Sequence, residues 1–254
     1  MIGIRLKRWL PTVLIVGYVA TVLIVDTLAV QGSKLVVTWN KWPPVTLTRH
    51  APLRQAADQA GADDNAWVFD FSRFRWRLSN GFDVFKFLAW LAIPFVCCAV
   101  WMDWQYLTFK RWKPLDTRIL ITLALLGVAA IFAIRFFPSL SRYYSGMGYR
   151  PWGDKWVFIE HQAIWIFSWL VGWEFLHRYV LLTHFSKLWP RVGWLIVPVS
   201  EGLYHLQKPL PEAAAMVVFS IILTLWVMKR RNVLVSFFAH FIIEIELVAY
   251  LVLT

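Results

Sequence analysis

The stretch WEFLHR, residues 173–178, places a glutamate, a histidine and an arginine inside an otherwise apolar run. Two later stretches share this character, EGLYH at 201–205 and HFIIE at 240–244. A charged side chain at the centre of a membrane-spanning helix costs about 2.5–3.5 kcal/mol. Because a whole fold is stable by only about 5–15 kcal/mol, charges placed there seldom lack a role. The three stretches predict a polar site enclosed in a bundle of membrane helices.

The composition supports the membrane environment. The chain has 254 residues, is 59% hydrophobic and contains 17 tryptophans. A tryptophan-rich soluble core is excluded because the apolar runs are too long and too many. Many of the tryptophans stand near the ends of apolar runs, as in the aromatic belt at a bilayer surface. These are Trp9, Trp101, Trp104, Trp112, Trp156 and Trp189.

The net charge of +11 does not indicate a nucleic-acid partner. The basic residues cluster at the ends of apolar segments, at 5–8, 110–113 and 229–231. Flanking clusters of this kind obey the positive-inside rule. They predict a cytoplasmic N-terminus and, with an odd number of spans, a C-terminus on the opposite side.

The apolar runs predict an all-α, polytopic membrane helix bundle of about seven transmembrane helices. The first run is too long for a signal-peptide core and lacks a clear cleavage site, so we interpret it as a retained helix. The fifth apolar run, residues 190–206, is short and contains Pro198 and Gly202, which predicts a broken or re-entrant segment. The predicted spans are 9–30, 84–103, 118–137, 155–183, 190–206, 212–229 and 232–253.

We expect four parts along the chain: a first transmembrane helix (1–30), an extramembrane loop (31–83), accessory transmembrane helices (84–137) and a catalytic core (155–254). The loop is too polar to span, with Pro43-Pro44 and the polar run 56–65. In the run 69–77, aromatic residues alternate with arginines. That pattern fits either a short strand or a segment lying on lipid headgroups.

The candidate chemistry lies in the last four helices. Glu174 and Arg178 are four residues apart, so they share a helix face and can pair. His240 and Glu244 have the same spacing. Each pair alone fits an ordinary salt bridge or packing hydrogen bond. Together with His205, they can converge in one cavity. There a carboxylate and a histidine activate water, and a second histidine stabilises an oxyanion.

Metal chemistry is the competing interpretation, since two histidines and carboxylates are plausible zinc ligands. No His-Glu-x-x-His sequence occurs, and the spacing is not diagnostic. Cys97 and Cys98 are adjacent and build neither a disulfide framework nor a metal site. The remaining histidines of the region, His161, His177 and His184, are interpreted as structural. We expect no metal and no other cofactor.

The order of these residues resembles the CPBP family of CAAX prenyl endopeptidases, bacteriocin-processing proteins and abortive-infection membrane proteins. Its pattern is Glu-Glu-x-x-x-Arg, then Phe-x-x-x-His, then His-x-x-x-Asn on a four-helix core. The corresponding residues here are Glu174, Arg178, His205 and His240, within 155–253. The resemblance implies a glutamate-dependent intramembrane endopeptidase that needs no zinc. One glutamate and the middle histidine would activate water, and the last histidine would hold the oxyanion.

The sequence departs from that pattern at three positions. Trp173 stands where the family carries its first glutamate, Glu201 replaces the phenylalanine, and Glu244 replaces the asparagine. The stretch HLQKPLPE, residues 205–212, resembles a Lys-Pro-x-x-Glu variant of bacterial branches such as the myxosortases. The base is then Glu174, or else Glu212 or Glu201 supplies the missing carboxylate.

We therefore predict a membrane endopeptidase of the CAAX-protease type, a hydrolase that cleaves a membrane-associated peptide or a C-terminal sorting tail. The alternative is a non-catalytic relative that acts as an immunity or scaffold protein. A transporter is less favoured, because no paired broken helices in two related halves are present. The expected partners are membrane lipids and a membrane-associated substrate. The expected location is a bacterial inner membrane.

Overall fold

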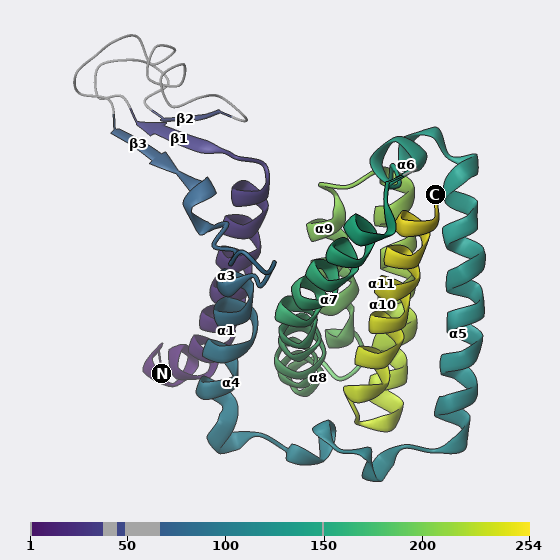
Figure 1. Ribbon diagram of the computed structural model, residues 1–254. Coiled ribbons are helices and arrows are strands. Elements are labelled where there is room, and N and C mark those ends of the chain that lie inside the picture. The colour runs from purple at the N-terminus through teal and green to yellow at the C-terminus, as the bar shows by residue number, and fades with distance from the viewer. Residues whose placement is uncertain (1, 38–44, 49–66, 149) are drawn as a thin grey trace. The chain divides into compact units, whose positions relative to one another are not determined.

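The structure is a computed structural model that describes residues 2–37, 45–48, 67–148 and 150–254 (Figure 1). The chain forms two compact units, Met1–Arg77 and Leu78–Thr254. Within the predicted loop, Pro43-Pro44 and the whole polar run 56–65 lie outside the described residues.

The first unit begins with helix α1 (Ile2–Val30), of which Trp9–Val30 is long and apolar enough to cross a membrane. Strands β1 (Lys34–Val37), β2 (Val45–Thr48) and β3 (Trp67–Asp70) follow. They form an antiparallel sheet in the order β2-β1-β3, with Val36 opposite both Thr46 and Val68. The predicted loop 31–83 thus contains a small sheet.

The alternating run 69–77 is a strand only at its start. The Asp70 carboxylate accepts a hydrogen bond from the Ser72 backbone N–H at 2.9 Å and caps the 3-10 helix η1 (Phe71–Phe74). Burial raises the pKa of Asp70, but the hydrogen bonds from Ser72 and the positive charges of Lys34 and Arg73 together lower it below its ordinary value. An aspartate in this position ends the extended conformation, because its side chain offers the following amides a partner.

Four further helices of the second unit are long and apolar enough to span. The first is a continuous run of α3 (Val84–Lys86), the π-helical turn η2 (Phe87–Ala92) and α4 (Ile93–Cys98). The others are α5 (Pro114–Ala133), α10 (Leu210–Arg230) and α11 (Leu234–Leu253). With α1 they account for five of the seven predicted spans.

The two remaining predicted spans form a long charged helix and a short one. The segment 155–183 lies in a helical run of α7 (Trp152–Glu174), the π-helical turn η7 (Phe175–Leu181) and α8 (Leu182–Leu188). The segment 190–206 forms the 3-10 turn η8 (Gly193–Leu195) and α9 (Ile196–His205). The 10 residues of α9 rise only about 15 Å, against the roughly 30 Å of a bilayer core. As Pro198 and Gly202 predicted, this helix does not cross.

Short helices connect the longer ones. The 3-10 helices η3 (Ala99–Trp101), η4 (Trp104–Leu107) and η5 (Phe109–Arg111) lead from α4 to α5. The 3-10 helix η6 (Ile134–Phe136) and helix α6 (Pro138–Tyr143) lead from α5 towards α7.

Helix α11 packs against both α5 and α7, and α10 packs against α9 and α11 (Figure 1). The π-helical turn η2 packs closely against α7 and closes the bundle on another side. A Cβ added to Gly172 of α7 would lie 2.8 Å from the backbone carbon of Trp90. Only glycine permits this approach, because an ordinary side chain would force the two helices apart. The charged part of α7 is consequently enclosed by protein on several sides.

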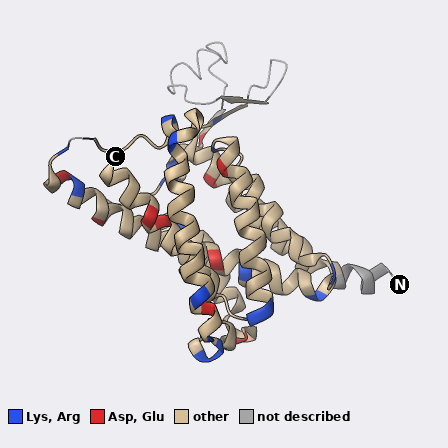
Figure 2. Ribbon diagram, turned by 90° about the vertical axis from the view of Figure 1, so that its right-hand side faces the viewer, with Lys and Arg blue, Asp and Glu red and all other residues tan. Residues whose placement is uncertain are grey.

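Lysines and arginines gather at one end of the second unit, at the bottom of the view in Figure 2. Contacts between distant segments place them there together. Arg230 at the end of α10 pairs with Asp116 of α5 at 2.6 Å, and Arg111 donates to the Arg231 carbonyl at 3.2 Å. This basic end joins the connection before α5 to the connection after α10.

Candidate active site

Arg178 lies fully buried between two carboxylates. It donates through Nη1 to Glu174 Oε1 at 2.9 Å. It also forms a two-bond pair with Glu201, from Nη1 to Oε1 at 2.7 Å and from Nη2 to Oε2 at 3.0 Å. All three side chains are at most 1% exposed. A bidentate pair fixes the plane of the guanidinium as well as its position.

The local helix geometry explains the pairing of Glu174 with Arg178. Glu174 is the last residue of α7, and Arg178 lies in the π-helical turn that follows. Residues four apart face one another on a helix, as the sequence predicted. Single π-helical turns inside α-helices occur often at functional sites, because they shift the register of the side chains beyond them.

His240 of α11 completes the cluster on the other side of Glu174. Its Nδ1 donates to Glu174 Oε1 at 2.8 Å. Its Nε2 lies 3.7 Å from Glu244 Oε1, too far for a hydrogen bond. His240 and Glu244, the predicted pair, are therefore close but not hydrogen-bonded. His240 instead forms its hydrogen bond with Glu174 of α7. An imidazole set between two carboxylates is stabilised in its protonated form.

His205 ends α9, one turn after Glu201. Its Nδ1 donates to the Glu201 backbone carbonyl at 2.8 Å. Because a carbonyl only accepts, the proton of a neutral His205 is on Nδ1, and its Nε2 carries a lone pair. No hydrogen bond joins His205 to Glu174. The structure thus brings Glu174, Arg178, Glu201 and His240 into direct contact and leaves His205 beside them.

Trp173 is the residue of α7 that packs against His205. Its ring lies 5.9 Å from His205, 5.0 Å from Tyr204 and 4.0 Å from His177 between centroids. It also packs on Trp90 at 5.1 Å. The position that carries a carboxylate in the family pattern is here part of an aromatic wall. Successive helix residues point about 100° apart, so Trp173 faces His205 while Glu174 faces His240.

Three polar atoms of the cluster have no hydrogen-bond partner among the described residues. They are Glu174 Oε2, Arg178 Nε and Trp173 Nε1. Buried polar atoms are satisfied in most proteins, and exceptions mark functional sites or bound water. Glu174 Oε2 is the most informative, because the other oxygen of the same carboxylate accepts from both Arg178 and His240.

Glu212 takes no part in the Arg178 cluster. Its Oε1 accepts from Lys208 Nζ at 2.5 Å, at the start of α10. Although burial favours the neutral amine, the Glu212 carboxylate raises the pKa of Lys208. The Lys-Pro-x-x-Glu stretch therefore forms a local ion pair, and Glu201 is the second carboxylate that reaches Arg178.

Of the histidines interpreted as structural, His177 lies nearest in sequence to the cluster. His177 is fully buried, and its two nitrogens lie 3.0 Å from the Trp173 carbonyl and 3.2 Å from Ser200 Oγ. Sequence reasoning missed Ser200, because its partner lies on another helix at no regular spacing. Within the described part of the chain, no group of three His, Cys, Asp or Glu side chains is arranged to hold a metal ion.

The fold and this cluster define a class: a multi-pass helical membrane protein whose buried glutamates, arginine and histidines converge from α7, α9 and α11. Residues 163–245, about a third of the chain, match the family model described as type II CAAX prenyl endopeptidase Rce1-like. No curated protein and no solved structure matches the chain.

The match confirms the resemblance to the CPBP family, because the Rce1-like segment contains all four residues on which that resemblance rests. It supports an intramembrane protease of the CAAX type. The narrower resemblance to myxosortases has no support from it.

Proposed function

We propose that this protein is an intramembrane endopeptidase that hydrolyses a membrane-associated peptide or a C-terminal sorting tail. The observation that carries the proposal is the Glu174 carboxylate. It is buried, held through Oε1 by Arg178 and His240, and has no hydrogen-bond partner at Oε2 among the residues that the structure describes. A fixed carboxylate with one free oxygen can bind and orient a water molecule.

His205 is the proposed base. Its hydrogen bond to the Glu201 carbonyl leaves Nε2 as the proton acceptor. Glu174 Oε2 offers a second acceptor to the same water. In this proposal Glu174 and His205 act together on one bound water molecule, because no hydrogen bond joins the two side chains directly.

His240 is the proposed oxyanion donor. Glu174 orients the ring through Nδ1, and Glu244 lies 3.7 Å from Nε2. In its protonated form the imidazole carries a hydrogen on Nε2 as well. That hydrogen is available to an oxyanion that forms in the site.

The chemical step balances with these groups. His205 Nε2 accepts a proton from water as the water oxygen bonds to the peptide carbonyl carbon, and the carbonyl electron pair moves to oxygen beside His240. When the intermediate collapses, the carbonyl double bond reforms and the carbon–nitrogen bond breaks. His205 then gives its proton to the leaving nitrogen. The products are a carboxylic acid and an amine.

Glu201 replaces the carboxylate that the chain lacks at Trp173. The family pattern supplies two glutamates and one arginine from a single helix. This chain supplies Glu174 and Arg178 from one helical run and Glu201 from α9. The arginine therefore still has two carboxylate partners, although no carboxylate stands at position 173. We propose Arg178 and Glu201 as positioning residues.

We further propose that the protein lies in a bacterial inner membrane with its N-terminus in the cytoplasm. The support is the basic end of the second unit, where Arg111, Lys187 and Arg230 gather.

The test compares the termini of membrane proteins, by mass spectrometry, in cells with and without the protein. Glu174→Gln, His205→Asn and His240→Ala should each reduce processing by at least about 100-fold. His161→Ala is the matched control, because His161 is an exposed histidine on α7. If all three site variants process substrate at the wild-type rate, the protease assignment fails and a non-catalytic, partner-binding role replaces it.

A further inference from the structure

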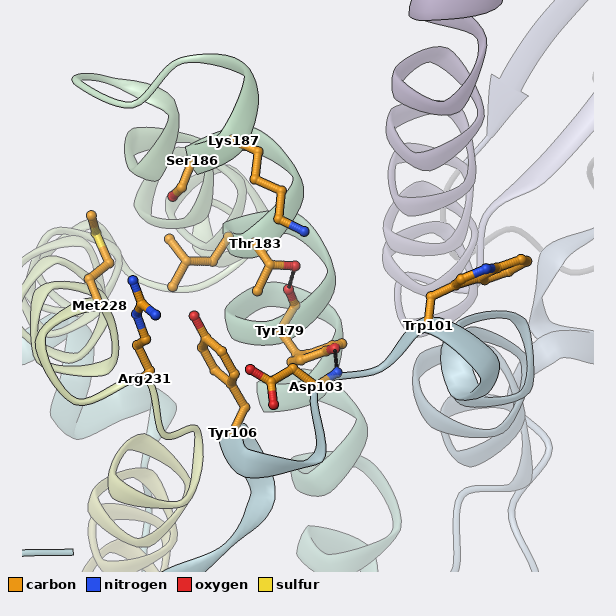
Figure 3. A pocket seen from close by; sticks show the side chains of 10 residues that line it. Trp101, Asp103, Tyr106, Tyr179, Thr183, Ser186, Lys187, Met228 and Arg231 are labelled. Atoms are coloured by element: carbon orange, nitrogen blue, oxygen red, sulfur yellow. Dashed lines mark hydrogen bonds between the residues drawn. The ribbon is translucent and has the colours of Figure 1, made fainter. Parts of the chain in front are cut away.

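A second polar site lies at the basic end of the second unit, away from the Glu174 cluster. It is a pocket of about 420 Å³ (Figure 3). Its walls come from the connection before α5, from the run of η7 and α8, and from the end of α10. Its lining includes Trp101, Asp103, Tyr179, Ser186, Lys187 and Arg231.

Two cations of the pocket have no partner. Neither Lys187 nor Arg231 forms a side-chain hydrogen bond or an ion pair with any residue that the structure describes. Other arginines at the same end are engaged: Arg230 pairs with Asp116, and Arg111 bonds to Gln105 and to the Arg231 carbonyl. Figure 3 shows Lys187 and Arg231 on opposite sides of the pocket. Two free cations facing one cavity indicate an anionic ligand.

Hydroxyl groups add hydrogen-bond donors between these cations. Ser186 Oγ is buried and has no partner among the described residues. Tyr179 OH accepts from the Asp103 backbone N–H at 2.7 Å, and its own hydrogen stays available. The pocket also holds the Asp103 carboxylate, whose Oδ1 caps the Gln105 amide at 3.1 Å. With two cations and one carboxylate, the lining retains a net positive charge.

The backbone at Arg231 points to a role for its side chain. Arg231 caps the end of α10 in the left-handed conformation, at φ 49° and ψ 48°. It is the only non-glycine residue with positive φ in the described part of the chain. Glycine adopts this conformation at no steric cost and is the usual residue there. An arginine kept at a strained position is consistent with a functional requirement.

The surroundings favour a lipid over a soluble anion. Trp101, at the mouth, is 83% exposed, and Trp104 and Phe109 on the same connection are 53% and 62% exposed. Exposed aromatic side chains beside a basic cluster mark the level of lipid headgroups. Basic pockets between membrane helices on the cytoplasmic side suit anionic headgroups.

We infer that this pocket binds the phosphate of an anionic membrane lipid, with Lys187 and Arg231 as the charged contacts. The ligand phosphate lies between the two cations and accepts from Ser186 and Tyr179. This site does not depend on the proposed protease activity.

The test measures lipid binding to the purified full-length protein by native mass spectrometry. The probes are phosphatidylglycerol and phosphatidylcholine. The double variant Lys187→Gln/Arg231→Gln removes both cations of the pocket. Its matched control is Lys229→Gln/Arg191→Gln, which removes two exposed cations from the same end outside the pocket. Equal thermal unfolding of the three proteins verifies that each is folded.

The wild type should bind phosphatidylglycerol in preference to phosphatidylcholine. Each lost cation weakens binding by about fivefold, so the pocket variant should lose about 25-fold and the control much less. Equal losses in the two double variants would show general attraction to the basic end and overturn the site. Competition by inorganic phosphate as effective as phosphatidylglycerol would show a soluble phosphate site and overturn the lipid assignment.

Discussion

The substitution Glu201→Gln tests the arrangement of the buried cluster directly. Glu201 makes two hydrogen bonds to Arg178, at 2.7 and 3.0 Å, in a fully buried environment. Glutamine keeps one acceptor and loses the charge. A hydrogen bond to a charged group contributes about 1.5–3 kcal/mol, so we expect a destabilisation in that range. Glu201→Leu removes both bonds and should cost about 3–5 kcal/mol.

The assay is thermal unfolding of the purified protein in detergent. A loss of about 1 kcal/mol lowers Tm by roughly 2–4 °C in a protein of about this size, so Glu201→Gln should lower Tm by about 3–12 °C. The matched control is Glu246→Gln. Glu246 Oε2 is buried without a partner among the described residues, so replacing its carboxylate should be neutral or stabilising.

A double-mutant comparison isolates the interaction between Glu201 and Arg178. In a background of Arg178→Met, the cost of Glu201→Leu should fall by at least about 1 kcal/mol, because the guanidinium that needed Glu201 is gone. If Glu201→Gln lowers Tm no more than Glu246→Gln does, the two-bond contact is not present and the role assigned to Glu201 is wrong.

Three other predictions concern packing, metal dependence and topology. Gly172→Ala should cost about 1–3 kcal/mol, since its Cβ would meet the Trp90 backbone, while Gly153→Ala has open space and should be neutral in the same unfolding assay. Proteolytic activity should survive zinc chelators, because Arg178 and His240 occupy Glu174 Oε1; loss restored by added zinc would contradict this. Cysteines at positions 191 and 150, both of which are exposed, should react with impermeant reagents from the cytoplasmic and the opposite side respectively; labelling of both from one side would require another topology.

Sequence reasoning reached the local features of the site. The pairing of Glu174 with Arg178 followed from helix spacing alone, and the short fifth segment followed from Pro198 and Gly202. The convergence of His240 with Glu174 was expected from the cost of separate buried charges. The helix boundaries followed from apolar runs, because a membrane requires long uninterrupted ones.

The remaining features depend on how helices meet, which spacing does not determine. The two-bond contact of Glu201 with Arg178 requires the particular angle at which α9 enters the bundle. The π-helical turn η7 has no signature in the residues Phe175–Leu181. The sheet of the first unit was missed because its strands are four residues each and lie in a stretch with the composition of a loop.

The shortness of α9 has a consequence for how water can reach the site. A helix that rises about half the bilayer core ends at membrane depth, where the carbonyl groups of its last turn require partners. The backbone N–H groups of Leu206 and Lys208 supply partners to the carbonyls of Leu203 and His205. His205 is the last residue of that helix. We expect water that enters where α9 ends to meet the His205 nitrogen proposed to deprotonate it, so the break after α9 is the hydration route that the proposed mechanism requires.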